Sequence, residues 1–335
     1  IKNPLTQVAR AAKRLPAGVR FALTGTPIEN RLSELWSIFD FLMPGLLGTR
    51  ESFAKRFESP VEHAEGDSAA RLQALVSPFV LRRVKEDVVA DLPEKIEDTV
   101  VAQLTGEQRK LYLANQDRIA QQVQHREAGE FKKDKLKVLA ELTKLRQICC
   151  DPRLHYEDYK AGSAKLDTCM ELVHGALDGG HRILLFSQFT GMLDIIGKRL
   201  AKEDIAFLKL TGASSKESRA KMVAQFQAGE VPVFLISLKA GGVGLNLTAA
   251  DVVIHYDPWW NVAAQDQATD RAHRIGQQHA VTVYKLIAKD TIEERIMQMQ
   301  ESKRDLVNSV LGGDGISSAL FTREDVLALL GGDGR

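Results

Sequence analysis

The chain has 335 residues, 44% of them hydrophobic, and a formal net charge of +1. That length is enough for two domains with sizeable cores. The balanced charge excludes a general polycation, so any nucleic-acid binding has to come from local basic clusters. The three cysteines form no C-x-x-C pair, which argues against a zinc site or a disulfide framework and favours a reducing compartment.

No run of 18 apolar residues predicts a membrane span, and the N-terminus lacks the pattern of a signal peptide. The eight histidines show no ligand spacing. We therefore expect neither a membrane partner nor a metal site. Because the chain opens at Ile1 without a methionine, we interpret it as an excised part of a longer protein.

Residues 1–45 begin with a basic, helix-like stretch. The apolar run Arg20–Thr24 predicts a strand that ends at the turn Gly25–Pro27, and apolar residues then recur at helical spacing over Leu35–Leu42. Residues 46 to about 158 are charged and poor in strand-like runs, and their apolar residues follow a helical period. We see no parallel-sheet pattern there and predict a helical insertion.

Residues 159 to about 290 alternate short apolar runs with helix-like segments, which predicts an α/β fold with a parallel sheet covered by helices on both faces. Helices are expected at 190–202, 215–228 and 261–273. In such sheets ligands bind at the carboxyl ends of strands, where Ser187, Ser237 and Asp257 fall. The predicted strands are Ile183–Ser187, Ala206–Leu210, Val233–Ser237, Val252–Tyr256 and Val281–Tyr284.

The C-terminal part predicts two more helices. The first starts with the capping-box pattern Thr291-x-x-Glu294 and continues as an apolar stripe to Val310. Gly312-Gly313 ends it. The tail, 313–335, contains a short helix candidate at Glu324–Leu330.

Two neighbouring blocks carry most of the chemistry. Residues 237–248 read SLKAGGVGLNLT, a glycine-rich turn after an apolar run that lets backbone approach a phosphate. Downstream, Arg271 and Arg274 are three residues apart, so a helix would place both on one face, where they could clamp a triphosphate oxygen. The alternative is a solvated face with salt bridges to Asp266 and Asp270, which the glycine-rich turn disfavours. No G-x-x-x-x-G-K-[ST] phosphate loop occurs, so we expect part of a nucleotide-driven machine that cannot run alone.

These blocks resemble a known family. Residues 266–277, DQATDRAHRIGQ, are similar to motif VI of the Swi/Snf-type ATPases, a branch of helicase superfamily two, and residues 237–247 resemble its motif V. Residues 183–189, ILLFSQF, resemble motif IV, and residues 23–30, LTGTPIEN, resemble motif III. The segments 81–88 and 92–95 resemble the inter-lobe segment. Together the likenesses run from residue 1 to about 300.

The resemblance implies two RecA-like lobes with ATP in the cleft between them. Residues 1–45 would end lobe one, 46–158 would form a helical protrusion with the inter-lobe segment, 159–312 would form lobe two with its closing helix, and 313–335 would be a tail. ATP and Mg²⁺ would be held mainly by the rest of lobe one, which lies outside this chain.

The resemblance also implies residue roles. Arg271 and Arg274 would reach the γ-phosphate, and Gln267 would organise the same face. The glycines of motif V would shape a loop shared by nucleotide and DNA; they are Gly241, Gly242 and Gly244. Thr24 and Thr26 would couple the nucleotide state to the grip on DNA, or would only hold their turn.

Other polar residues follow strands, in positions suited to phosphate and sugar contacts. The alternative is plain loop exposure, but motifs IV and V line the DNA path in relatives, so the resemblance favours DNA. We favour packing over base stacking for Trp259 and Trp260. The expected DNA-binding residues are Gln188, Thr211, Ser237, Lys239 and Asn246.

The sequence thus predicts the C-terminal part of an ATP-dependent translocase on double-stranded DNA that remodels or displaces DNA-bound proteins. Its partners would be duplex DNA, a DNA-bound protein and lobe one of the same parent chain. Two alternatives remain: a non-hydrolysing regulatory module that binds DNA or protein, and a strand-separating helicase. The expected location is the cytoplasm, with the nucleoid, in a bacterium and the nucleus in a eukaryote.

Overall fold

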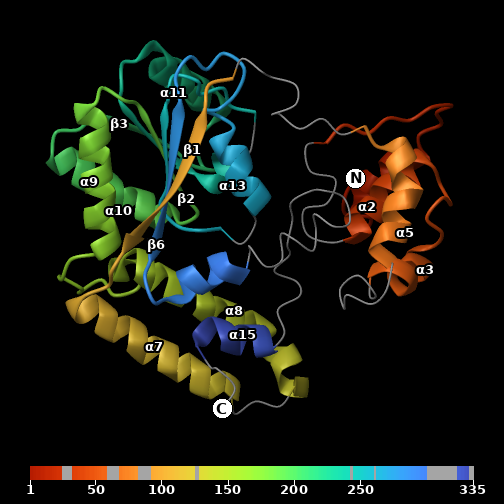
Figure 1. Ribbon diagram of the computed structural model, residues 1–335, viewed down its shortest axis with the longest axis horizontal. Helices are drawn as coiled ribbons and strands as arrows, with labels where there is room; N and C mark the ends of the chain where they lie inside the picture. Colours follow the sequence, from red (N-terminus) through yellow and green to blue (C-terminus); the bar gives the residue numbers. More distant parts are fainter. Residues whose placement is uncertain are drawn as a thin grey trace. The chain divides into compact units, whose positions relative to one another are not determined.

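The computed structural model describes residues 1–24, 32–58, 68–81, 92–124, 128–241, 244–259, 262–299 and 323–331 (Figure 1). The described residues up to 81 form one compact unit. Those of 92–259, 264–298 and 323–331 form a second. The predicted positions Thr26, Gly242 and Trp260 lie outside the described residues, as does most of the C-terminal stripe beyond 299.

The first unit is helical. A cluster of buried side chains from Leu35 to Val76 forms its core, and the Arg20 guanidinium donates to the carbonyls of Leu15 and Phe41, both at 2.8 Å. Its helices are α1 (Gln7–Arg14), α2 (Leu32–Leu42), α3 (Arg50–Phe53), the π-helix η1 (Ala54–Glu58), α5 (Ser68–Val76) and the 3₁₀ helix η2 (Ser77–Phe79).

The predicted strand Arg20–Thr24 is wrong: these residues form no strand. Phe21 and Leu23 are 81% and 98% exposed, so their apolar side chains gain nothing from burial. Among the described residues no neighbouring strand supplies a hydrogen-bonded ladder. Apolar composition alone does not make a strand without a partner.

The second unit is built on a six-stranded sheet in the order β1-β6-β5-β2-β4-β3, with every pair parallel (Figure 1). This confirms the α/β fold class. The five strands predicted between residues 159 and 290 are all present, four of them within one residue of the predicted bounds, and the fifth extends four residues further, to Ala288. The strands are β1 (Lys95–Ala102), β2 (Ile183–Ser187), β3 (Phe207–Leu210), β4 (Val233–Ser237), β5 (Val252–His255) and β6 (Val281–Ala288).

Alternation along the central strands explains both layers. In β2, Ile183 and Leu185 face a cluster with α9 (Ala164–Asp178) and α10 (Thr190–Lys202). Leu184 and Phe186 face the opposite cluster, which includes side chains of α11, α12 and α13. Because both faces are covered, β2, β4 and β5 are buried along their whole length. These helices are α11 (Lys216–Ala228), α12 (Leu238–Gly241) and α13 (Val262–Thr269).

The expectation that 46–158 contains no sheet strand is corrected by β1. This strand pairs with β6 over its full length at the sheet edge, and most of its side chains are exposed. Glu97 bonds Lys285 across the strands at 2.6 Å and Lys95 at 2.7 Å. Burial would raise the pKa of Glu97, but the two lysines outweigh it and lower that pKa to about 2. Pairing and charge, rather than an apolar pattern, therefore hold β1.

The remaining helices flank this sheet. The helix over 292–299 confirms the predicted start after Thr291, whose Oγ1 accepts from the Glu293 N–H at 3.2 Å. The predicted tail helix is confirmed as α15 (Arg323–Leu330), which packs on α7 (Gly106–Gln124), where Gln116 Nε2 donates to the Leu330 carbonyl at 2.7 Å. The long helix α8 (Ala128–Cys150) and the 3₁₀ helix η3 (Pro152–Leu154) precede α9.

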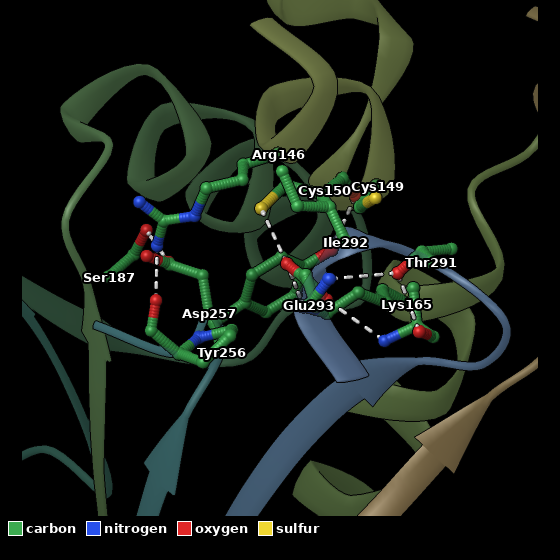
Figure 2. Close-up of polar contacts among 12 residues, drawn as sticks. Arg146, Cys149, Cys150, Lys165, Ser187, Tyr256, Asp257, Thr291, Ile292 and Glu293 are labelled. Atoms are coloured by element: carbon green, nitrogen blue, oxygen red, sulfur yellow. Dashed lines mark hydrogen bonds and ion pairs between the residues drawn. The ribbon is translucent and has the colours of Figure 1, made fainter. Parts of the chain in front are cut away.

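A buried ion pair joins three of these elements. Lys165 Nζ, at the start of α9, lies 2.8 Å from Glu293 Oε2, and both side chains are fully buried (Figure 2). The same oxygen accepts the Ala288 N–H at 2.9 Å, at the end of β6. Burial alone would lower the pKa of Lys165, but the Glu293 carboxylate outweighs it and holds that pKa above its ordinary value.

We predict that Lys165→Met destabilises the fold by about 3–5 kcal/mol, because it leaves the Glu293 charge buried without its partner. The measurement is the free energy of unfolding in denaturant. The matched control is Lys209→Met, which removes an exposed pairing with Asp194 and should cost less than about 1 kcal/mol. Equal effects of the two substitutions would contradict the assignment.

Candidate nucleotide and DNA site

The structure brings the glycine-rich segment against the arginine turn. The Leu247 N–H donates to the Arg271 carbonyl at 2.9 Å, and Arg274 Nη1 donates to the Leu245 carbonyl at 3.3 Å. Leu245 and Leu247 are buried in the core beneath, which anchors the backbone between them. Gly244, at φ +47°, takes a left-handed conformation that glycine adopts without strain. The segment therefore runs from the carboxyl end of β4 to the two arginines.

The predicted helix 261–273 ends early, at Thr269. Arg271 and Arg274 lie in the turn that follows, so they do not share a helix face as expected. Beyond Thr269 the helical pattern changes, because the Arg271 N–H donates to the carbonyl three residues before it, Ala268, at 3.2 Å. Backbone bonds from Ala272 and His273 to the Thr269 carbonyl, at 3.0 and 3.2 Å, then wind the chain tightly.

Positive charge is concentrated in this turn. Arg271 and Arg274 are both partly buried. Burial and then the neighbouring charge of Arg274 lower the pKa of Arg271, although an arginine stays protonated near neutrality. The Asp270 carboxylate opposes this lowering, and guanidinium groups bind phosphate oxygens well. The turn thus suits a polyphosphate, and no described group of three His, Cys, Asp or Glu residues could hold a metal ion.

Two histidines that the sequence left without a role hold the turn. His255 Nε2 lies 2.8 Å from Thr269 Oγ1, and its ring stacks on Phe186. His273 Nε2, between the arginines, bonds the Pro93 carbonyl at 2.7 Å. Pro93 lies two residues before β1, so the turn is bonded both to the central sheet and to the segment that enters it. Neither hydrogen bond could be predicted from the local sequence, because each histidine bonds a residue outside its own segment.

The other predicted nucleotide residues are only partly described. Gln267 is half-buried on α13, four residues before Arg271. Gly241 ends α12. Thr24 is exposed in the first unit, so the structure gives no geometry linking it to the arginines.

The predicted DNA-binding residues occupy different environments. Thr211 is partly buried after β3, and Asn246 is exposed in the glycine-rich segment. Lys239 belongs to α12, and its side chain lies outside the described part. Ser237 is buried, so its position does not support the predicted contact with DNA. Trp259 is partly buried and packs against the core cluster on that face of the sheet, as the packing interpretation expects.

Gln188 is partly buried and belongs to a network with buried Arg146 and Asp257 that the sequence did not reveal. Arg146, from α8, donates from Nη1 to Gln188 Oε1 at 3.1 Å and from Nη2 to the Pro258 carbonyl. Gln188 Nε2 donates to Asp257 Oδ2 at 2.6 Å, and the Ser187 hydroxyl donates to the other oxygen of Asp257. Figure 2 shows the Arg146 side chain reaching toward Ser187 and Asp257 at the ends of β2 and β5.

Comparison with known proteins identifies the class. Residues 1–154 match the SNF2-related domain, and residues 164–276 match the helicase conserved C-terminal domain. The C-terminal domain of a SWI2/SNF2 ATPase from Sulfolobus solfataricus is 34% identical, with a TM-score of 0.55, and the alignment covers 66% of this chain and 91% of that one. The parallel sheet is thus that of a RecA-like helicase lobe.

The match extends beyond this lobe. The Sulfolobus solfataricus SWI2/SNF2 ATPase core in complex with double-stranded DNA is 39% identical, with a TM-score of 0.57, over 93% of this chain and 66% of that one. An uncharacterized ATP-dependent helicase of Mycoplasma pneumoniae is 40% identical over 98% of this chain. The chain belongs to the SWI/SNF-type ATPases of helicase superfamily two. It spans about a third of the length of the curated relatives it matches.

His255 makes stability depend on pH. Burial and then the charge of Lys285 lower the pKa of His255 to about 3. The unfolded chain therefore takes up a proton below about pH 6.5 that the folded chain refuses. We predict that His255 lowers the free energy of unfolding by up to about 1.4 kcal/mol for each unit by which the pH falls between 6.5 and 3.

The measurement is the free energy of unfolding between pH 7 and 4.5 for the wild type and for His255→Gln. Glutamine cannot titrate, so the variant should show the shallower slope. Identical slopes would contradict a buried neutral His255.

Proposed function

We propose that this chain is the C-terminal part of an ATP-dependent translocase on double-stranded DNA that remodels or displaces DNA-bound proteins. The observation that carries the proposal is the pair Arg271 and Arg274, held in one turn against the glycine-rich segment. A protein that only binds DNA has no need to concentrate two partly buried guanidinium groups beside a phosphate-binding backbone. The proposal therefore favours nucleotide chemistry over the alternative of a non-hydrolysing regulatory module.

In this mechanism the chain stabilises charge. Bound ATP with Mg²⁺ supplies the phosphoanhydride whose hydrolysis drives the cycle, and both would be held mainly by lobe one of the same parent chain. Arg271 and Arg274 would hold the γ-phosphate as its negative charge redistributes in the transition state. Gln267 would orient groups on the same face. Gly241, Gly242 and Gly244 would let the backbone approach the phosphates.

Movement would come from alternating grip on DNA. Thr211, Lys239 and Asn246 would contact the phosphate backbone without reading sequence, and Thr24 and Thr26 would couple the nucleotide state to that grip. The likeness to a DNA-bound archaeal core supports the duplex as partner. The glycine-rich segment joins the carboxyl end of β4 to the arginine turn, so a shift at either end reaches the other.

A strand-separating helicase is the third candidate, and a strand-displacement assay distinguishes it from a translocase.

Within the described ranges, no helix is both long and apolar enough to cross a membrane. We propose a location with the nucleoid in a bacterium and in the nucleus of a eukaryote.

In the full-length parent, we predict that Arg274→Ala lowers the ATPase kcat by about a thousand-fold, the scale of an arginine finger. The matched control is Arg199→Ala, which removes a surface arginine of α10 paired with Glu203 and should leave kcat within two-fold. Unchanged ATP hydrolysis in Arg274→Ala would favour the regulatory module.

We predict that the isolated 335-residue chain hydrolyses ATP no faster than buffer, with or without duplex DNA, because it contains no phosphate loop. A phosphate-release assay measures this. The positive control is the full-length parent under the same conditions. Robust, DNA-stimulated turnover by the chain alone would contradict the proposed division of labour between lobes.

A further inference from the structure

A buried cation and a buried anion are bridged here by a single neutral amide. The Arg146 guanidinium and the Asp257 carboxylate are 1% and 0% exposed. Gln188 lies between them, accepting from Arg146 through Oε1 and donating to Asp257 through Nε2. Charge at both ends fixes the orientation of the amide, because the reversed orientation would set donor against donor and acceptor against acceptor.

This arrangement engages both ends of the Gln188 side-chain amide and its backbone N–H. Its Nε2 also approaches the Pro258 carbonyl at 3.5 Å, and its backbone N–H donates to Asp257 Oδ2 at 3.2 Å. A DNA contact through this amide would break a partly buried hydrogen bond to the fully buried Asp257 carboxylate, and hydrogen bonds to charged groups contribute more to stability than neutral ones. Gln188 therefore acts as a bridge.

The network ties three distant segments together. Arg146 lies near the C-terminal end of α8, whereas Gln188 follows β2 and Asp257 follows β5. Arg146 also holds the Pro258 carbonyl, one residue before Trp259, whose N–H bonds Gln265 of α13 at 3.3 Å. A displacement of α8 is thus passed to the two loops at the carboxyl edge and to the helix that leads into the arginine turn.

We propose that Arg146 is a positioning residue, through which α8 sets the loops after β2 and β5 for DNA-stimulated ATP hydrolysis. This rests on the proposed function. Arginine suits the task because its planar fork serves two acceptors on different segments at once. A structural role alone would not need that fork, since apolar residues often replace buried charges without loss of stability.

The test uses the full-length parent and the variant Arg146→Lys. Lysine keeps the buried positive charge but serves the two acceptors poorly. Loss of one charge-assisted hydrogen bond corresponds to about a ten-fold change. We expect the duplex concentration that half-saturates ATPase stimulation to rise about ten-fold, with thermal stability close to that of the wild type.

The matched control is Arg153→Lys. Arg153 lies just after the same helix and also makes two bonds to a carboxylate, but its partner Asp151 is local in sequence. The control should leave the half-saturating concentration within two-fold. Gln188→Glu, which places a second carboxylate beside Asp257, should reproduce the effect of Arg146→Lys.

Amide hydrogen exchange provides a readout that does not depend on activity. Arg146→Lys should speed exchange at Gln188 and Phe189 about ten-fold, and Arg153→Lys should not. Faster exchange without any change in DNA half-saturation would overturn the positioning role, as would a DNA defect in Gln188→Glu alone. If the wild-type parent shows no DNA-stimulated ATPase, the proposed function fails, and the exchange data separate that failure from an error in the network.

Discussion

The candidate site depends on one backbone hydrogen bond, from the Leu247 N–H to the Arg271 carbonyl. Together with the bond from Arg274 Nη1 to the Leu245 carbonyl, it joins the segment leaving β4 to the turn leaving α13. Burial of Leu245 and Leu247 gives the bond a rigid base. Because the arginines come from this turn, their positions follow from how the glycine-rich segment lies on the sheet.

Charged side chains have different partners in the arginine turn and in the protein interior. In the turn, the charge of Arg274 lowers the pKa of Arg271 and the nearby Asp270 carboxylate raises it. In the interior, charges are matched within the chain. Lys165 meets Glu293 directly, and Arg146 meets Asp257 through Gln188. The interior pairs hold the sheet and helices together, whereas Arg271 and Arg274 are proposed to stabilise the negative charge of a bound nucleotide.

Sequence predicted the features that depend on local pattern. The strands β2 and β4 have the predicted bounds because each is a continuous apolar run that is wholly buried, and α10 has them because its buried residues recur at helical spacing. The sequence analysis missed β1 because most of its side chains are exposed, so the strand shows no apolar alternation. Its stability comes from pairing with β6. It placed a strand at Arg20–Thr24, where the chain has no described partner, and it extended α13 past the point where buried Thr269 bonds His255.

The same distinction applies to the site. Arg271 and Arg274 were predicted from a motif, whereas Arg146, His255 and Asp257 act through partners that are distant in sequence.

The most direct measurement is a structure of the full-length parent with duplex DNA and a transition-state analogue of ATP. The account predicts both guanidinium groups within about 3 Å of the terminal phosphoryl oxygens. Guanidinium groups bound instead to carboxylates of the same chain, facing away from the nucleotide, would contradict it.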